Sequence, residues 1–148
     1  MITALLLLAA TQQRDTVDMD HVLRSSIVAA YGIMKRNSFV QSAPHIRIDV
    51  QSMRQATGTS ADFSSSLTAL GSVGTIDDRR DCGNGERCPI IKVISVTRSN
   101  DSVFVRLVLN QTRTTNGRTG AAFATYKVTL ARRNGVFEVV SASVASIT

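Results

Sequence analysis

Residues 126–141, YKVTLARRNGVFEVVS, decide the fold. Apolar and polar residues alternate on both sides of Asn134-Gly135, and an Asn-Gly dipeptide between alternating runs is the strongest short-range signal for a β-hairpin. The alternation places Tyr126, Val128 and Leu130 on the same face of the first strand. The stretch therefore predicts two antiparallel strands, residues 121–131 and 136–147, joined by a tight turn.

Two more strands are predicted upstream of this hairpin, at residues 90–97 and 102–112, with a turn at residues 98–101. In the second of them the odd-numbered positions from Val103 to Leu109 are apolar and should face the core. The opposite face of the sheet is mixed, and we expect it to look outward with Phe104, Arg106, Phe123 and Lys127. The last part of the chain is thus expected to be a four-stranded antiparallel meander without a βαβ unit.

The best predicted helix covers residues 16–34, because its apolar residues recur at three- and four-residue spacing and form one stripe: Met19, Val22, Leu23, Ile27, Ala30, Tyr31 and Met34. A half-buried strand is predicted at residues 45–53, HIRIDVQSM, and a short second helix at residues 60–71. The order α-β-α-β-β-β-β predicts an α+β fold with the long N-terminal helix, and the short one, packed on a curved antiparallel sheet.

The chain begins with an apolar, signal-like segment at residues 1–12, and residues 13–148 are expected to form one α+β domain. The apolar run is too short to cross a bilayer core of about 30 Å as a helix, but it fits the core of a signal peptide. No basic residue precedes the run, and cleavage after Ala10 would leave Leu8 where a small residue is expected. An atypical signal, a start further upstream and a buried N-terminal segment all stay open; export to a periplasm or the exterior is the favoured interpretation.

The two cysteines, Cys82 and Cys88, lie in the charged stretch DDRRDCGNGERCPII, residues 77–91. A structural zinc site needs four ligands, and redox pairs usually have two residues between the cysteines, so neither fits this spacing. We therefore predict a disulfide, worth about 2.4 kcal/mol in the loop-entropy model. A disulfide would agree with export into an oxidising compartment.

The formal net charge is +6, and from Arg98 onward seven basic and two acidic side chains give +5. Such a surface can steer a protein to a polyanion or an anionic membrane, although the basic residues are spread out, which favours an ordinary solvated surface. The chain has no Trp and few aromatic residues, so a platform for single-stranded nucleic acid is not expected.

The order of elements and the final hairpin resemble the nuclear transport factor 2-like, or SnoaL-like, superfamily, which has the cystatin-like cone fold. The resemblance covers residues 15–145 by element order, and by motif it covers the hairpin: Tyr126, Val128, Leu130, Arg132, Asn134, Gly135, Phe137, Val139 and Val140. The resemblance implies a conical cavity between helix and sheet. Some members are isomerases, dehydratases or cyclases that use this cavity for their reaction. Other members bind ligands, dimerise or serve envelope assemblies. No catalytic motif of the family matches here, so no catalytic residue is carried over.

If the apolar faces point inward, the interior is aliphatic and the candidate ligand pocket is lined by Tyr31, Met34 and Tyr126. His21 can face Asp18 across one helical turn as an acid–base pair, but a surface histidine is the favoured interpretation. His45, Arg47 and Asp49 are expected on the solvent side of their strand. We predict no catalytic set, no metal site and no cofactor.

These observations favour a small exported or envelope-associated protein that binds or assembles without catalysis, while leaving the enzyme question open. One alternative is an isomerase- or dehydratase-like enzyme that uses the cone pocket. Another is an accessory that docks on anionic surfaces through its basic sheet. Expected partners are a second copy bound through the outer sheet face, or an unknown protein or small apolar ligand; nucleic acid is not expected.

Overall fold

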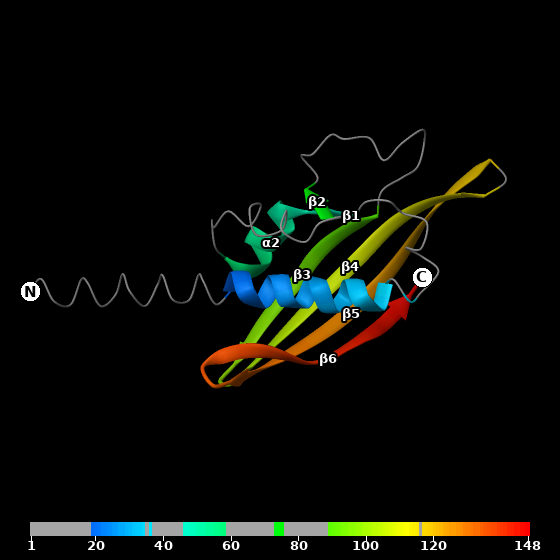
Figure 1. Cartoon of the computed structure of the whole chain (residues 1–148). Helices are drawn as coiled ribbons and strands as arrows, with labels where there is room; N and C mark the ends of the chain where they lie inside the picture. The colour runs from blue at the N-terminus through cyan, green and yellow to red at the C-terminus, as the bar shows by residue number, and fades with distance from the viewer. Residues whose placement is uncertain (1–18, 35, 37–45, 59–72, 76–88, 116) are drawn as a thin grey trace, which may run out of the picture.

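A long helix lies across one face of a six-stranded sheet (Figure 1). The computed structural model describes residues 19–34, 36, 46–58, 73–75, 89–115 and 117–148. Residues 19–34 and 36 are helical, so the described part of the predicted range is a helix that also includes Arg36. The expected α+β fold with a helix packed on a sheet is therefore confirmed.

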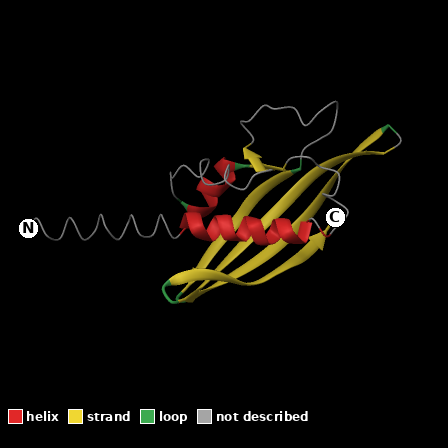
Figure 2. Ribbon diagram, in the orientation of Figure 1, coloured by secondary structure: helices red, strands yellow, loops and turns green. Residues whose placement is uncertain are grey.

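The antiparallel meander makes up most of the sheet (Figure 2). The strand order is β2-β1-β3-β4-β5-β6, so two short strands extend the meander beyond β3. The strands are β1 (Ile46–Ile48), β2 (Val73–Thr75), β3 (Ile90–Ser99), β4 (Ser102–Thr115), β5 (Arg118–Arg133) and β6 (Val136–Ile147).

The expectation of a wholly antiparallel sheet without a βαβ unit is wrong. Strand β1 runs parallel to both of its neighbours, β2 and β3. Between β1 and β2 the chain forms the helix α2 (Val50–Thr57), so β1, α2 and β2 make a small βαβ unit. A parallel pair needs such a crossover, because a tight turn can join only antiparallel strands.

Helix α2 also corrects the strand predicted at residues 45–53. Asp49 keeps an extended backbone, and its Oδ1 accepts the backbone N–H of Ser52 at 3.1 Å, which caps the helix. At the other end Gly58 adopts φ 67°, a left-handed conformation that favours glycine. Asp49 is therefore a partly buried cap and not a solvent-side strand residue. The second helix predicted at residues 60–71 lies outside the described residues.

The predicted hairpin at Asn134-Gly135 is confirmed. Both residues have positive φ, 51° and 81°, and Arg133 pairs with Val136 across the turn. Two positive φ values in a two-residue loop define a type I′ turn, whose twist matches that of the flanking strands. The Asn-Gly dipeptide therefore fixes both the turn and the register of β5 against β6.

The core fills the space between the long helix and the inner face of the sheet. The predicted helix stripe is buried except for Tyr31, which is partly buried, and Leu23, Ile27 and Met34 have no exposed surface. Ser26 is the buried polar side chain among the described residues, and its hydroxyl donates to the Val22 carbonyl at 2.7 Å. The sheet contributes Ile91, Val93, Val103, Val105, Leu107, Leu109, Ala124, Tyr126, Val128, Leu130 and Phe137.

Three β-bulges interrupt the ladders of the meander. The register against β4 skips Ile94 in β3, and the register against β5 skips Val140 and Ala145 in β6. A bulge adds one unpaired residue to one strand, bends it and increases its twist. The skipped residues Ile94 and Val140 are 51% and 44% exposed and lie on the outer side of the sheet.

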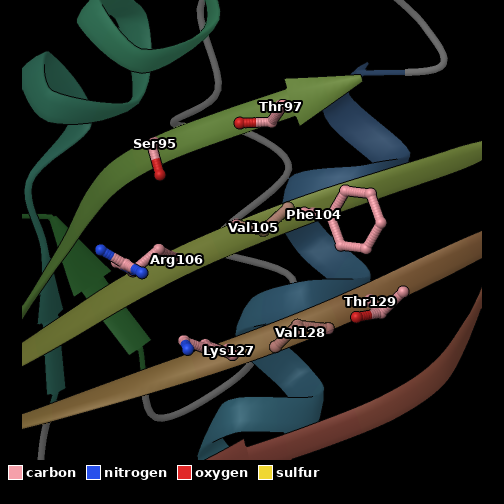
Figure 3. A pocket seen from close by; sticks show the side chains of 8 residues that line it. All are labelled: Ser95, Thr97, Phe104, Val105, Arg106, Lys127, Val128 and Thr129. Atoms are coloured by element: carbon pink, nitrogen blue, oxygen red, sulfur yellow. The ribbon is translucent and has the colours of Figure 1, made fainter. Parts of the chain in front are cut away.

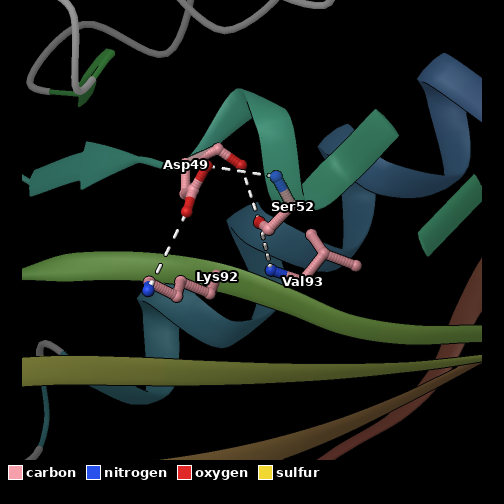
Figure 4. Close-up of polar contacts among 4 residues, drawn as sticks. All are labelled: Asp49, Ser52, Lys92 and Val93. Atoms are coloured by element: carbon pink, nitrogen blue, oxygen red, sulfur yellow. Dashed lines mark hydrogen bonds and ion pairs between the residues drawn. The ribbon is translucent and has the colours of Figure 1, made fainter. Parts of the chain in front are cut away.

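Ser52 connects α2 to β3 (Figure 4). Its hydroxyl donates to the Asp49 carbonyl at 2.7 Å and accepts the Val93 backbone N–H at 3.0 Å. Strand β1 ends at Ile48 and offers no further carbonyl to the Val93 N–H. The Ser52 hydroxyl oxygen accepts this hydrogen bond instead. Lys92 adds a contact from its Nζ to Asp49 Oδ2 at 4.0 Å.

We expect Ser52→Ala to lower the free energy of unfolding by about 1–3 kcal/mol, because the partly buried Val93 N–H loses its acceptor. Urea denaturation would measure the change. Gln51→Ala, at an exposed position of the same helix, is the control and should stay within about 0.5 kcal/mol of the wild type. Equal stability of the two variants would contradict this role of Ser52.

Candidate binding groove on the outer sheet face

The predicted pocket residues lie in or beside the packed core. Met34 and Tyr126 are 0% and 1% exposed, and Tyr31 packs against the core at its border. Among the described residues, the buried side chains of the interior are apolar apart from Ser26, whose hydroxyl is bonded within the helix. This part of the interior therefore offers no carboxylate or imidazole to a ligand, and the three-residue pocket stays a prediction.

The phenol of Tyr126 is held neutral by its surroundings. Burial raises the pKa of Tyr126 above its usual value of 10.0, because desolvation disfavours the phenolate. A general base at neutral pH needs a group that gives up its proton readily there. Tyr126 therefore acts as a core residue rather than as a base.

We expect the free energy of unfolding to fall as the pH rises above about 10, because the unfolded chain releases the Tyr126 proton before the folded state does. Tyr126→Phe should remove the part of this fall in unfolding free energy that comes from Tyr126. Tyr31→Phe keeps Tyr126 and should therefore show the same fall from that residue. Urea denaturation at several alkaline pH values would measure the slopes. The same alkaline slope in wild type and Tyr126→Phe would contradict the buried, neutral phenol.

His21 serves as a link between the helix and the sheet. Its Nε2 lies 2.9 Å from the carbonyl oxygen of Phe137 in β6, a geometry that places the ring proton on Nε2. The residue therefore donates to the backbone, which agrees with a structural role. Asp18, its predicted acid partner, and His45 lie outside the described residues, as do Cys82 and Cys88.

A groove of about 360 Å³ opens on the outer face of the meander, opposite the long helix (Figure 3). Strands β3, β4 and β5 each contribute part of its lining. The lining residues are Ser95, Thr97, Phe104, Val105, Arg106, Lys127, Val128 and Thr129. Hydroxyl, cationic and aromatic side chains face the groove, whereas the side chains of Val105 and Val128 are buried in the core on the inner face.

Strand register brings the polar lining together in two cross-strand rows. In one row Ser95 is opposite Arg106, Arg106 is opposite Lys127, and Lys127 is opposite Ser143 of β6. The second row consists of Thr97, Phe104, Thr129 and Ser141. Side chains opposite one another in neighbouring strands are close enough to act on the same ligand. Figure 3 shows the two cationic head groups at one side of the groove and the Phe104 ring at the other.

The bulge at Ile94 determines which side chains of β3 line the groove. Strict alternation after Ile91 and Val93, which are buried, would turn Ser95 and Thr97 inward as well. The extra residue reverses the alternation, so both hydroxyl side chains line the outer groove and Val96 packs toward the core. The sequence shows no local signal for this reversal, and we therefore did not expect Ser95 and Thr97 in a site.

Arg106 and Lys127 form a pair of like charges. Cations directly opposite each other in a sheet repel and cost stability. Among the described residues no carboxylate forms an ion pair with either of them, whereas Lys92 contacts Asp49 and Arg133 contacts Glu138, each at 4.0 Å. The prediction that Phe104, Arg106, Phe123 and Lys127 share an exposed outer face is confirmed. Their opposition across the ladder is visible only in the structure.

No protein-family model, curated protein or solved structure matches this chain. Within the described part of the chain, no group of His, Cys, Asp and Glu is arranged to hold a metal ion. Nor is any helix among the described residues long and apolar enough to cross a membrane. The proposed function therefore rests on the geometry of the groove and of the core.

Proposed function

We propose that this protein is a non-catalytic binding or assembly module that holds its partner on the outer face of the meander. The observation that carries the proposal is the division of the sheet into two faces. The inner face is packed against the helix with apolar side chains, while the outer face presents a groove with two cations, three hydroxyls and an exposed phenyl ring. Binding chemistry is therefore concentrated on the outer face.

The enzyme alternative is less well supported by the same residues. An isomerase or dehydratase of the cone type needs an acid or base inside the cone. The buried polar side chain in the described interior is Ser26, and its hydroxyl is already bonded to Val22. The packing of the helix across a bent meander supports membership of the nuclear transport factor 2-like superfamily, which we retain as part of the proposal.

Export and the disulfide belong to the same proposal. The signal-like segment at residues 1–12 and the pairing of Cys82 with Cys88 support each other, because disulfides persist in oxidising compartments. Both cysteines should resist alkylation in the absence of a reductant and react after reduction. Intact mass spectrometry of the exported protein measures this directly. Two alkylated cysteines without reduction would contradict the disulfide.

Selection from a library of random dodecapeptides tests the binding function without a known partner. The immobilised protein should enrich peptides whose affinity falls by at least about tenfold in the Phe104→Ser variant, as for an aromatic residue at the centre of an interface. Phe104 is 46% exposed and lies outside the core, so this change should keep the fold and cost about 1 kcal/mol or less in lost cross-strand contacts.

Val28→Ser is the matched control, because Val28 is 49% exposed on the helix and is not part of the sheet. It should bind the enriched peptides as the wild type does. A selection that yields no peptides, or peptides that bind Phe104→Ser and the wild type equally, would contradict a binding role of the outer face.

A further inference from the structure

The geometry points to a ligand class for the groove. We propose that it is a carboxylate site, which binds an acidic side chain from a protein segment lying across the outer face. An apolar neighbour of that acidic residue would pack against Phe104. The inference rests on the proposed binding function and adds the chemistry of the partner.

Arg106 and Lys127 form a pair of cations that has no ion pair with a carboxylate of the described residues. Arg106 and Lys127 face each other across β4 and β5, and the groove lining contains no carboxylate. The repulsion between them is a local cost that an anion placed between the head groups would cancel. The planar guanidinium can donate two parallel hydrogen bonds to one carboxylate, and the ammonium can add a third.

The side chains around the two cations also suit an acidic protein segment. Ser95 lies opposite Arg106, so a hydroxyl donor borders the proposed anion position, while Thr129 lies opposite Phe104. Phe104 occupies the other end of the groove, and Phe123 adds a second exposed ring, 41% exposed, further along β5. Exposed aromatic rings around an arginine are typical of protein interfaces.

The small number of cations in the groove lining argues against a polyanion as its ligand. Binding to nucleic acid or to an anionic membrane gains its strength from many basic side chains acting together. The groove provides two, while Lys92 and Arg133, which lie outside its lining, contact Asp49 and Glu138 at 4.0 Å. Two cations with a neighbouring hydroxyl donor fit one acidic side chain better than an extended chain of phosphates.

A second copy of this chain is also a poorer occupant. A twofold dimer formed through the groove would bring the same surface of both copies together. If the twofold axis passed through the groove, Arg106 and Lys127 of one copy would meet the same cations of the other, and like charges across an interface disfavour association. An acidic segment of a different protein meets the groove with complementary charge.

The peptide selection also tests this inference. Peptides enriched on the wild type should carry Asp or Glu beside an apolar residue. Their affinity should fall by at least about tenfold in Arg106→Gln, and by a similar factor when the peptide acid is replaced by its amide. The double variant with Arg106→Glu and Lys127→Glu should instead enrich peptides that carry Lys or Arg.

Arg133→Gln is the matched control, because it removes the same charge from an exposed position at the end of β5 outside the groove lining. It should change the affinity less than about twofold. The free Arg106→Gln protein should melt at or above the wild-type temperature at low salt, since it loses the repulsion with Lys127. Binding would then be lost while stability is kept.

Three results would overturn the inference. Enriched peptides without acidic residues that still depend on Phe104 would refute the carboxylate site and leave the binding function standing, whereas loss of the Phe104 dependence would refute the binding function itself. Displacement of an acidic peptide by phosphatidylserine vesicles or by a single-stranded oligonucleotide at comparable affinity would assign the groove to polyanions. A dimer in light scattering that Phe104→Ser dissociates would assign it to a second copy.

Discussion

Packing of the long helix against the inner face of the meander is the constraint on which the rest of the structure depends. Leu23 and Ile27 of the apolar stripe have no exposed surface, and the stripe covers the inward residues of β3, β4 and β5. Burial of that apolar area is the main favourable term in folding a domain of this size. Because side chains alternate along a strand, using one face for the core leaves the other face of every strand for solvent or a partner. The location of the candidate groove thus follows from the location of the core.

The bulges and the α2 connection adapt the sheet to this packing. Bulges at Ile94, Val140 and Ala145 bend β3 and β6, so the sheet can curve around a single helix. By accepting the Val93 N–H, Ser52 continues the hydrogen bonding of β3 beyond the end of β1, next to the bulge at Ile94. The bulge at Ile94 also determines the outer face, because it turns Ser95 and Thr97 toward Arg106 and Phe104. The feature that bends the sheet is therefore also the feature that completes the groove.

Much of the fold could be predicted from local patterns. The helix stripe, the alternation in β4 and β5 and the Asn134-Gly135 turn each depend on residues close in sequence, and each prediction was correct. In residues 45–53 the strand prediction is correct for Ile46–Ile48 and wrong from Asp49 onward, because apolar residues at positions 46, 48 and 50 fit one long strand as well as a strand followed by a helix. The deciding interaction is the capping of α2 by Asp49, one polar contact that competes with the alternation. The parallel position of β1 depends on distant pairing with β3, which no local pattern specifies.

The sequence by itself determined which side chains lie on each face of β4 and β5, because alternation is a property of each strand alone. It thereby placed Phe104, Arg106, Phe123 and Lys127 on one outer face. The tertiary structure alone decided that Arg106 faces Lys127 and that Ser95 joins them, because register and bulges depend on pairing between distant segments. The charges are local properties of the chain. The opposition of Arg106 and Lys127, on which the proposed ligand rests, arises only when β4 and β5 pair.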